Sequence, residues 1–395
     1  MFFVSLFLIL FLSIIISFLF TKLKLPPLIG FILIGILLGP YCLDLIDINI
    51  LNISSELRKI ALILILIRAG LSLNLQDLKK IGYPAVLMSF VPAIFEIIAV
   101  GLFAPLLFDI SYLDAFILGS VLGAVSPAVV VPRMIEMIDK KQGTNNSLPQ
   151  LVIAGSSIDD VVVIVIFTAL TTVAMGNQVS VLTFLNVPSA IILGIITGLF
   201  MGFLLVKMFK KIHMRDTIKV IIICGISFGF YGMEILLSPF IGFSGLLASM
   251  TLGISILWKY AVLAKRLANK YAKLWVVSEI ILFVLLGASV DINYFFTNFF
   301  FGIILMAFSL LIRSLGVLVS LTNTPFNKKE KCFIMVSYLP KATVQAAIGG
   351  LPLSMGLPSG ALILSIAVIY ILITAPIGAF GIDHLKYKLL GVPLS

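Results

Sequence analysis

Residues 150–175 read QLVIAGSSIDDVVVIVIFTALTTVAM, an apolar segment with two acids, Asp159 and Asp160, near its middle. A helix rises about 1.5 Å per residue, so a segment of this length can cross the hydrocarbon core of a bilayer. Charged side chains are costly at that depth and mark functional sites by default. The segment therefore predicts a membrane helix that carries a functional pair of acids.

The whole chain has the composition of a membrane protein. Of its 395 residues, 61% are hydrophobic and 11% are charged, with a mean hydropathy of +1.23, which excludes an ordinary soluble globular domain. The net charge of +10 does not indicate nucleic acid, because the basic residues fall between apolar segments rather than on one face or in one tail. The three separated cysteines do not match a disulfide framework or a metal site, and we expect no cofactor.

Polar breaks divide the chain into about thirteen apolar segments, so we predict an all-α polytopic membrane protein. The predicted spans cover residues 1–20, 26–40, 57–74, 84–107, 112–132, 150–175, 182–209, 217–237, 242–258, 274–290, 295–321, 332–354 and 360–381. The first segment lacks a basic start and a small-residue cleavage site, so we expect a retained span rather than a signal peptide.

Basic residues fall in alternate loops and orient the chain. They cluster at residues 22–24, 79–80, 133–141, 207–215, 259–273, 328–331 and 386–388, whereas the opposite loops hold only acids or no charge, apart from Arg58 and Lys59. By the positive-inside rule the basic side faces the cytoplasm, which puts the N-terminus outside and the C-terminus inside. We expect a plasma-membrane protein surrounded by lipid, with loops too short for a catalytic or nucleotide-binding domain.

Two short segments indicate an inverted repeat. The sequence PLIGF at residues 27–31 and the sequence PFIGF at residues 239–243 each open a predicted span, and these spans are an odd number apart. One therefore starts inside and the other outside, as an inverted-topology repeat requires.

Two other spans are interrupted by proline at equivalent places in the two repeats. One break lies at Ser126 and Pro127, and the other runs from Pro340 through Lys341 to Thr343. Proline removes a backbone donor and frees carbonyl groups at membrane depth, which persists where the break lines a cavity. We predict two broken helices that cross, as in transporters with inverted repeats. A simple proline kink in either helix is the alternative.

Ionisable side chains far from the predicted helix ends are Glu96, Asp159, Asp160, Arg313 and Lys341. Glu96 and Arg313 lie at equivalent places in the two repeats with opposite charges, so pairing would offset much of the cost of burying either one. Such a pair fits a structural role at least as well as a catalytic one. Lys341 either neutralises the negative ends of half-helices or pairs with Asp159, and the sequence leaves both open.

The acid pair has the chemistry of a cation site. Neighbours in a helix point about 100° apart, so Asp159 and Asp160 face different partners. Ser156 lies one turn before Asp160 on the same face, and carboxylate and hydroxyl oxygens suit small hard cations. Loss of water favours the neutral form of a carboxyl group, so a proton and a cation would compete for one carboxylate, as antiport requires. Alternatively, the pair only neutralises a basic residue and ties helices together.

Three motifs resemble a known family, the monovalent cation/proton antiporters, and most closely its sodium/proton NHA branch. They are VSPAVVVP at residues 125–132, SIDD at residues 157–160 and LPKATVQAA at residues 339–347, and the similarity runs through nearly the whole chain. The resemblance implies exchange of Na⁺, or Li⁺, for H⁺ by a homodimer that works by alternating access with an elevator motion.

The resemblance also implies roles for individual residues. It makes Asp160 the principal cation and proton carrier, with Asp159 beside it, and it makes Glu96 and Arg313 a buried salt bridge. Electrogenic relatives often have a lysine where this chain has Arg313. A guanidinium group does not in practice release its proton, so the exchange ratio of those relatives does not carry over.

A division into domains follows from the same resemblance. Residues 1–81 and 211–291 would form the dimerisation domain, residues 82–176 and 292–395 the moving core, and residues 177–210 the linker helix.

Three other functions fit parts of the pattern. A potassium/proton exchanger would share the helices and charges of a sodium/proton exchanger. An intramembrane aspartyl protease needs its two acids on different helices, whereas Asp159 and Asp160 are adjacent. An ion channel would not need titrating acids between broken helices. The sequence therefore favours a transporter rather than an enzyme.

Overall fold

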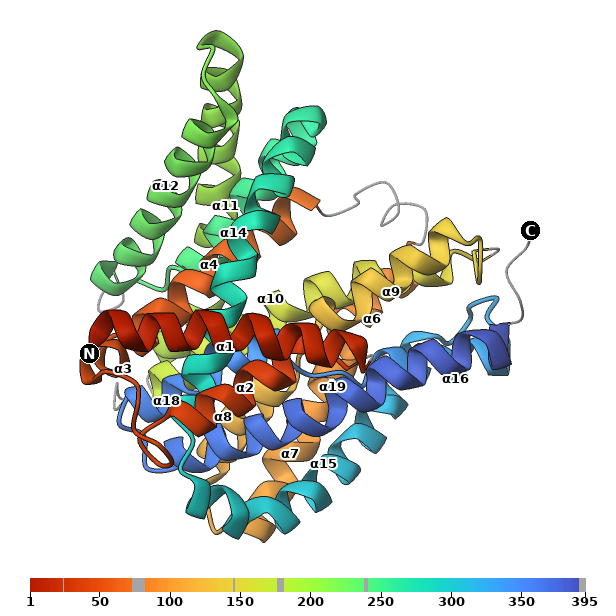
Figure 1. Cartoon of the computed structure of the whole chain (residues 1–395). Coiled ribbons are helices and arrows are strands. Elements are labelled where there is room, and N and C mark those ends of the chain that lie inside the picture. Colours follow the sequence, from red (N-terminus) through yellow and green to blue (C-terminus); the bar gives the residue numbers. More distant parts are fainter. Residues whose placement is uncertain (24, 73–81, 145, 176–180, 238–240, 391–395) are drawn as a thin grey trace. The chain divides into compact units, whose positions relative to one another are not determined.

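The computed structural model of the chain describes residues 1–395 except 24, 73–81, 145, 176–180, 238–240 and 391–395 (Figure 1). Inside its helices, the side chains of residues 157–158, 161, 181–188 and 191 are not described. The described residues form helices and no strand. The chain divides into a larger unit of Met1–Ser55, Gln76–Met175 and Leu282–Ser395 and a smaller unit of Glu56–Leu75 and Gly176–Ile281.

The larger unit holds both segments predicted to form the core. Its helices are α1 (Phe2–Lys22), α2 (Pro27–Leu38), α3 (Ile48–Asn52), α6 (Tyr83–Met88), α7 (Val91–Phe108), α8 (Tyr112–Leu122), α9 (Pro127–Asp139), α10 (Leu148–Ala174), α15 (Ile292–Ser320), α16 (Lys328–Ser337), α17 (Thr343–Ile348), α18 (Leu351–Ser354) and α19 (Gly360–Leu390). Helix α7 packs against α8 and α15, and α19 packs against α15 and α16. Helices from the two predicted repeats therefore lie side by side in this unit.

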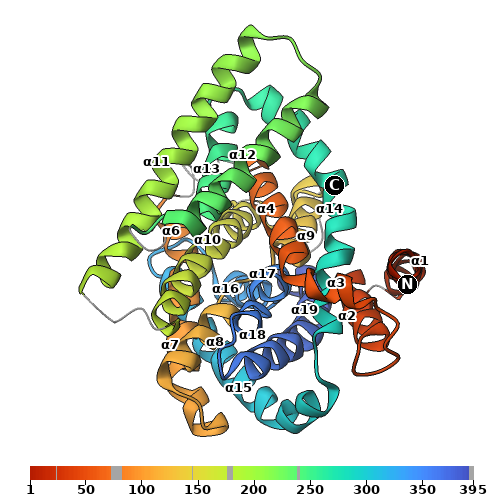
Figure 2. The same cartoon turned by 90° about the vertical axis from the view of Figure 1, so that its left-hand side faces the viewer.

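The smaller unit is a separate helical bundle, best followed in Figure 2. Its helices are α4 (Ser54–Ser72), α11 (Val181–Lys211), α12 (Asp216–Leu237), α13 (Gly245–Lys259) and α14 (Ala261–Ala288); α4 begins and α14 ends in the larger unit. Gly198 on α11 leaves no room for a Cβ atom, because the backbone of Ala248 and the side chain of Thr251 on α13 lie against it. Small residues allow this close approach of two membrane helices.

Eight helices of the described chain are long and apolar enough to cross a membrane. Shorter apolar helices occur at Pro27–Leu38, Val162–Ala174 and Gly245–Lys259. The all-α polytopic class predicted from the sequence is thereby confirmed, while the count of about thirteen spans stays a prediction. The second PLIGF-like segment lies partly outside the described residues, at 238–240.

The span predicted at residues 84–107 is found at Tyr83–Phe108, but it contains a break that was not predicted. Helix α6 ends at Met88 and α7 begins at Val91. The cause is Pro92, which has no N–H to donate to the carbonyl of Met88 and so stops a continuous helix at this point.

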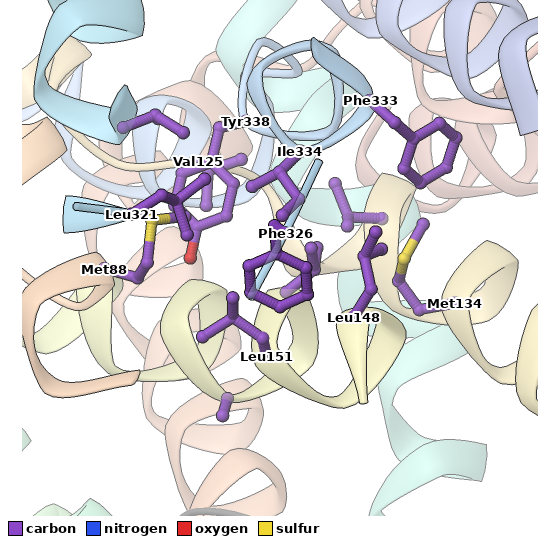
Figure 3. Packing of buried hydrophobic residues seen from close by; sticks show 14 of the residues in the cluster. Met88, Val125, Met134, Leu148, Leu151, Leu321, Phe326, Phe333, Ile334 and Tyr338 are labelled. Carbon is purple, nitrogen blue, oxygen red and sulfur yellow. The ribbon is translucent and has the colours of Figure 1, made fainter. Parts of the chain in front are cut away.

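An apolar cluster fills the space among α6, α9, α10, α16 and the end of α19 (Figure 3). Its buried members are Ala85, Met88, Val125, Val130, Met134, Met137, Leu148, Leu151, Val152, Ala154, Val317, Leu321, Phe326, Phe333, Ile334, Tyr338 and Ile382. Tyr338 and Val125 lie toward one end of the cluster, and Phe333 and Met134 lie toward the other. The first end adjoins the two helix breaks, because Val125 lies in the first break and Tyr338 directly precedes the second.

Candidate functional site

Two interrupted helices meet in the larger unit. Helix α8 ends at Leu122 and α9 begins at Pro127, while α16 ends at Ser337 and α17 begins at Thr343. The backbone N–H of Ser126 donates to the carbonyl oxygen of Pro340 at 2.8 Å, which joins the two non-helical segments directly. The prolines predicted to break these spans therefore lie at a contact between the two breaks.

Arg313 is the most highly connected side chain at this contact. It projects from α15 with 1% of its surface exposed. Its Nη1 atom donates to Glu96 Oε2 at 2.7 Å and to the carbonyl of Gly123, its Nη2 atom donates to Asp159 Oδ2 at 2.9 Å, and its Nε atom donates to the carbonyl of Tyr338 at 2.9 Å. The planar guanidinium therefore binds two carboxylates and the carbonyl groups at both breaks, a geometry that the single ammonium of lysine does not reproduce.

Lys341 shares the same glutamate. Its Nζ atom lies 2.5 Å from Glu96 Oε2 and donates to the carbonyl of Leu122 at 2.7 Å, and its backbone N–H donates to Thr374 Oγ1 at 2.9 Å. Leu122 is the last residue of α8, so the ammonium group lies at the negative end of that half-helix. Of the two roles considered from the sequence, the geometry corresponds to neutralising the helix end; the carboxylate paired with Lys341 belongs to Glu96.

Asp159 is held from two sides. Its Oδ2 atom accepts from Arg313 and, at 2.8 Å, from the backbone N–H of Val125 in the first break. Its Oδ1 atom accepts no hydrogen bond from the residues described and is fully buried. One oxygen of Asp159 thus fixes the carboxylate in place, and the other remains available for a ligand.

Asp160 has a different environment. Its side chain is only partly buried, and neither a salt bridge nor a hydrogen bond connects it to the rest of the described chain. Ser156, one turn earlier on α10, donates its hydroxyl hydrogen to the carbonyl of Ile153 at 3.1 Å, which leaves the lone pairs of Oγ. The adjacent acids are therefore distinguished by their partners, as their directions on a helix require.

Two hydroxyl groups mark the starts of the second half-helices. Ser126 precedes Pro127, the first residue of α9, and Thr343 is the first residue of α17. Both side chains are buried, and neither Ser126 Oγ nor Thr343 Oγ1 finds a hydrogen-bond partner within the described part of the protein. Buried hydroxyl groups are normally satisfied, so these oxygens at positive helix ends are available to a ligand.

Gln345 belongs to the same region and was not selected from the sequence as a site residue. Its Nε2 atom donates to the carbonyl of Ala124 at 2.9 Å and to that of Leu122 at 3.3 Å. The signal that could have identified it is an amide inside an apolar half-helix, directly after the second break.

A second charged network lies at the far end of α9. Arg133 pairs with Asp383 at 3.1 Å, and Lys386 lies 3.3 Å from both Asp383 and Glu136. Glu136 also accepts from Lys140 at 2.6 Å, and this hydrogen bond raises the pKa of the exposed lysine. These pairs join the end of α9 to α19, while the Ser126–Pro340 bond joins its start to the second break.

All site residues selected from the sequence lie in the larger unit. The structure brings Glu96, Asp159, Arg313 and Lys341 into one buried network and places Asp160 and Ser156 beside it on α10. Within the described ranges, no three His, Cys, Asp or Glu side chains are grouped to hold a metal ion.

Comparisons with known proteins find relatives in sequence and in fold. Residues 7–385 match the family described as sodium/hydrogen exchanger, transmembrane. The chain is 34% identical to sodium/hydrogen exchanger 9B2 of Homo sapiens over 382 residues, which covers 93% of this chain and 70% of that protein. It is 31% identical to human sodium/hydrogen exchanger 9B1 over 381 residues, which covers 93% of this chain and 73% of that protein. The solved structure of the sodium proton antiporter MjNhaP1 from Methanocaldococcus jannaschii at pH 8 shares the fold, with a TM-score of 0.84, 20% identity and 97% of both chains covered.

Proposed function

Because the chain belongs to the sodium/hydrogen exchanger family, we propose that it exchanges Na⁺ for H⁺ by alternating access, with both ions competing for Asp160. Membership of a transporter family confirms the assignment made from the three motifs. The choice of Na⁺ and the role of Asp160 are the proposed parts.

The observation that carries the proposal is the balance of buried charge. Arg313 and Lys341 supply two positive charges, and Glu96 and Asp159 supply two negative charges in contact with them. Asp160 adds one carboxylate that these pairs leave unmatched. A lone ionised carboxylate is costly away from bulk water, so it is stabilised either by a proton or by a bound cation. Alternation between these two states is the chemical step of an antiporter.

The oxygen atoms near the crossing suit a small cation. Asp159 Oδ1, Ser126 Oγ and Thr343 Oγ1 are buried oxygens without a donor in the described structure, and Ser156 Oγ lies on the face of Asp160. Oxygen ligands favour hard cations such as Na⁺ and Li⁺. We expect Li⁺ to replace Na⁺, while K⁺ requires a wider cavity; a potassium/proton exchanger remains the alternative.

The proposed movement involves the helices that carry the site. We infer a core made of residues 82–176 and 292–395, which the contact between the breaks and the α9–α19 network hold together. Residues 1–81 and 211–291 would form the dimerisation domain of a homodimer, with residues 177–210 as a linker. The core would move as an elevator, since its internal contacts oppose separation of its helices.

The expected orientation follows from the basic loops. We propose that the N-terminus lies outside and the C-terminus in the cytoplasm of a plasma-membrane protein. In that orientation the cluster members that precede the acids on α10, such as Leu148 and Leu151, lie toward the cytoplasm, and their separation would be one step of opening to that side.

The experiment is transport by purified protein in liposomes. An inward Na⁺ gradient should drive proton efflux, reported by a pH-sensitive dye trapped in the lumen, in wild type but not in Asp160→Asn. The same gradient made with K⁺ tests the alternative exchanger. An ion channel would give Na⁺ flux that does not require proton counterflow and survives Asp160→Asn; either of these results would exclude the exchange proposed here.

A further inference from the structure

The amide of Gln345 holds the end of α8 from the opposite broken helix. The side chain is fully buried, and its Nε2 atom bonds the carbonyl groups of Ala124 and Leu122. Leu122 also accepts from Lys341, and the intervening Gly123 accepts from Arg313. Three successive carbonyl groups at the end of a half-helix are thus satisfied by side chains of the other repeat, as buried carbonyls require.

The segment that Gln345 holds leads directly to the acid pair. After Ala124 comes Val125, whose N–H donates to Asp159, and then Ser126, whose N–H donates to Pro340. These bonds follow one another along the backbone. A shift of Ala124 therefore moves the N–H group that orients Asp159, although no hydrogen bond in the described structure joins Gln345 to either acid.

A neutral amide suits position 345 better than a charged side chain. Two cations already balance Glu96 and Asp159, and a third cation at position 345 would oppose binding of Na⁺ beside Asp160. A carboxylate would face two carbonyl oxygens without a hydrogen to donate. A neutral amide donates two hydrogens and leaves the charge balance unchanged.

We propose that Gln345 is a positioning residue for the cation site. Its amide holds the first break in place while the Asp160 carboxylate binds a proton and a cation in turn. This inference rests on the proposed exchange function and adds to it a residue that sets the affinity for Na⁺ without binding the ion.

The test uses two substitutions and a matched control in the same liposome assay. Gln345→Met keeps the length but removes the amide, and Gln345→Glu replaces the donor by a carboxyl group that donates only when protonated. Gln142→Glu is the control, because Gln142 is 1% exposed and its amide likewise donates to a backbone carbonyl, that of Lys386 at 2.8 Å. Gln142 is bonded to the backbone of Lys386, a member of the other charged network, rather than to the break beside the acid pair.

We expect Gln345→Met to raise the Na⁺ concentration for half-maximal exchange by about fivefold, the factor equivalent to one ordinary hydrogen bond. In Gln345→Glu, the ratio of mutant to wild-type exchange rate should fall as pH rises, because the ionised carboxylate repels the carbonyl groups. For Gln345→Met, the ratio of mutant to wild-type half-saturation concentration should be the same at every pH. The control should keep the wild-type half-saturation concentration and pH profile.

The inference would be overturned if both Gln345 variants kept the wild-type Na⁺ half-saturation concentration and pH profile. This holds even if less folded protein is recovered, because a purely structural role changes only the amount of folded protein. If neither variant folds, Gln345 is required for folding and the proposed role is also rejected. Absence of exchange in wild type would instead reject the proposed function.

Discussion

Replacing each member of the acid pair by asparagine should have opposite consequences for stability and transport. Asp159→Asn removes a carboxylate that contacts Arg313 at 2.9 Å in a buried network. Loss of one partner of a buried ion pair costs about 3–5 kcal/mol, and the lower value applies because Arg313 keeps Glu96 and two carbonyl groups. We expect the apparent melting temperature in detergent to fall by about 5 °C.

Asp160→Asn should change stability by less than about 1 kcal/mol, since no ion pair in the described chain is lost. Exchange should nevertheless disappear, because the amide neither titrates nor supplies a charged ligand. Asp159→Asn should retain slower exchange in which Na⁺ and H⁺ still compete.

The assay combines thermal unfolding of the purified variants, followed by the remaining monodisperse fraction, with dye-reported proton flux in liposomes. Asp109→Asn is the control; it lies at the exposed end of α7 with φ of 51°, a conformation that asparagine tolerates, and should change neither measurement. A more stable Asp159→Asn, or an Asp160→Asn protein that still exchanges, would refute this assignment of roles.

Three further results are expected. Lowering the pH should raise the Na⁺ concentration for half-maximal exchange, because a proton on Asp160 removes the ligand; a half-saturation value independent of pH in the flux assay would show that the ions do not share one carboxylate. Glu96→Ala and Arg313→Ala should each reduce thermal stability, yet the double variant should lose less than the sum; additive losses would mean that the two side chains are not coupled. Gly155→Ala should destabilise by about 1–3 kcal/mol, because its Cβ would overlap the Tyr338 hydroxyl, and Tyr338→Phe should relieve that loss in unfolding measurements; a Gly155→Ala protein as stable as wild type would contradict this packing.

Local chemistry made part of this structure predictable. Proline acts on its own helix, so the breaks before Pro127 and around Pro340 could be expected from the sequence. The same argument applied to Pro92 would also have predicted the separation of α6 from α7. Hydropathy identified the membrane helices because this signal is also local: in lipid, each helix must form the hydrogen bonds of its own backbone.

The partners within the site depend on how the broken helices cross, which no spacing in the sequence specifies. The opposite charges of Glu96 and Arg313 indicated a possible pair, but not that the same guanidinium also reaches Asp159. Lys341 had two plausible partners for the same reason. A hydrogen bond from Gln345 to Ala124 is still less visible, because an amide carries no charge that would single it out.

The bond between the N–H of Ser126 and the carbonyl of Pro340 joins the two breaks through main-chain atoms alone. No substitution at position 340 removes its carbonyl acceptor, and only proline at position 126 removes the donor. Selection on ion preference can therefore exchange the side chains around the crossing while the backbone junction persists. A transporter built in this way can change its ion preference by side-chain substitutions while the backbone hydrogen bond between its two broken helices is kept.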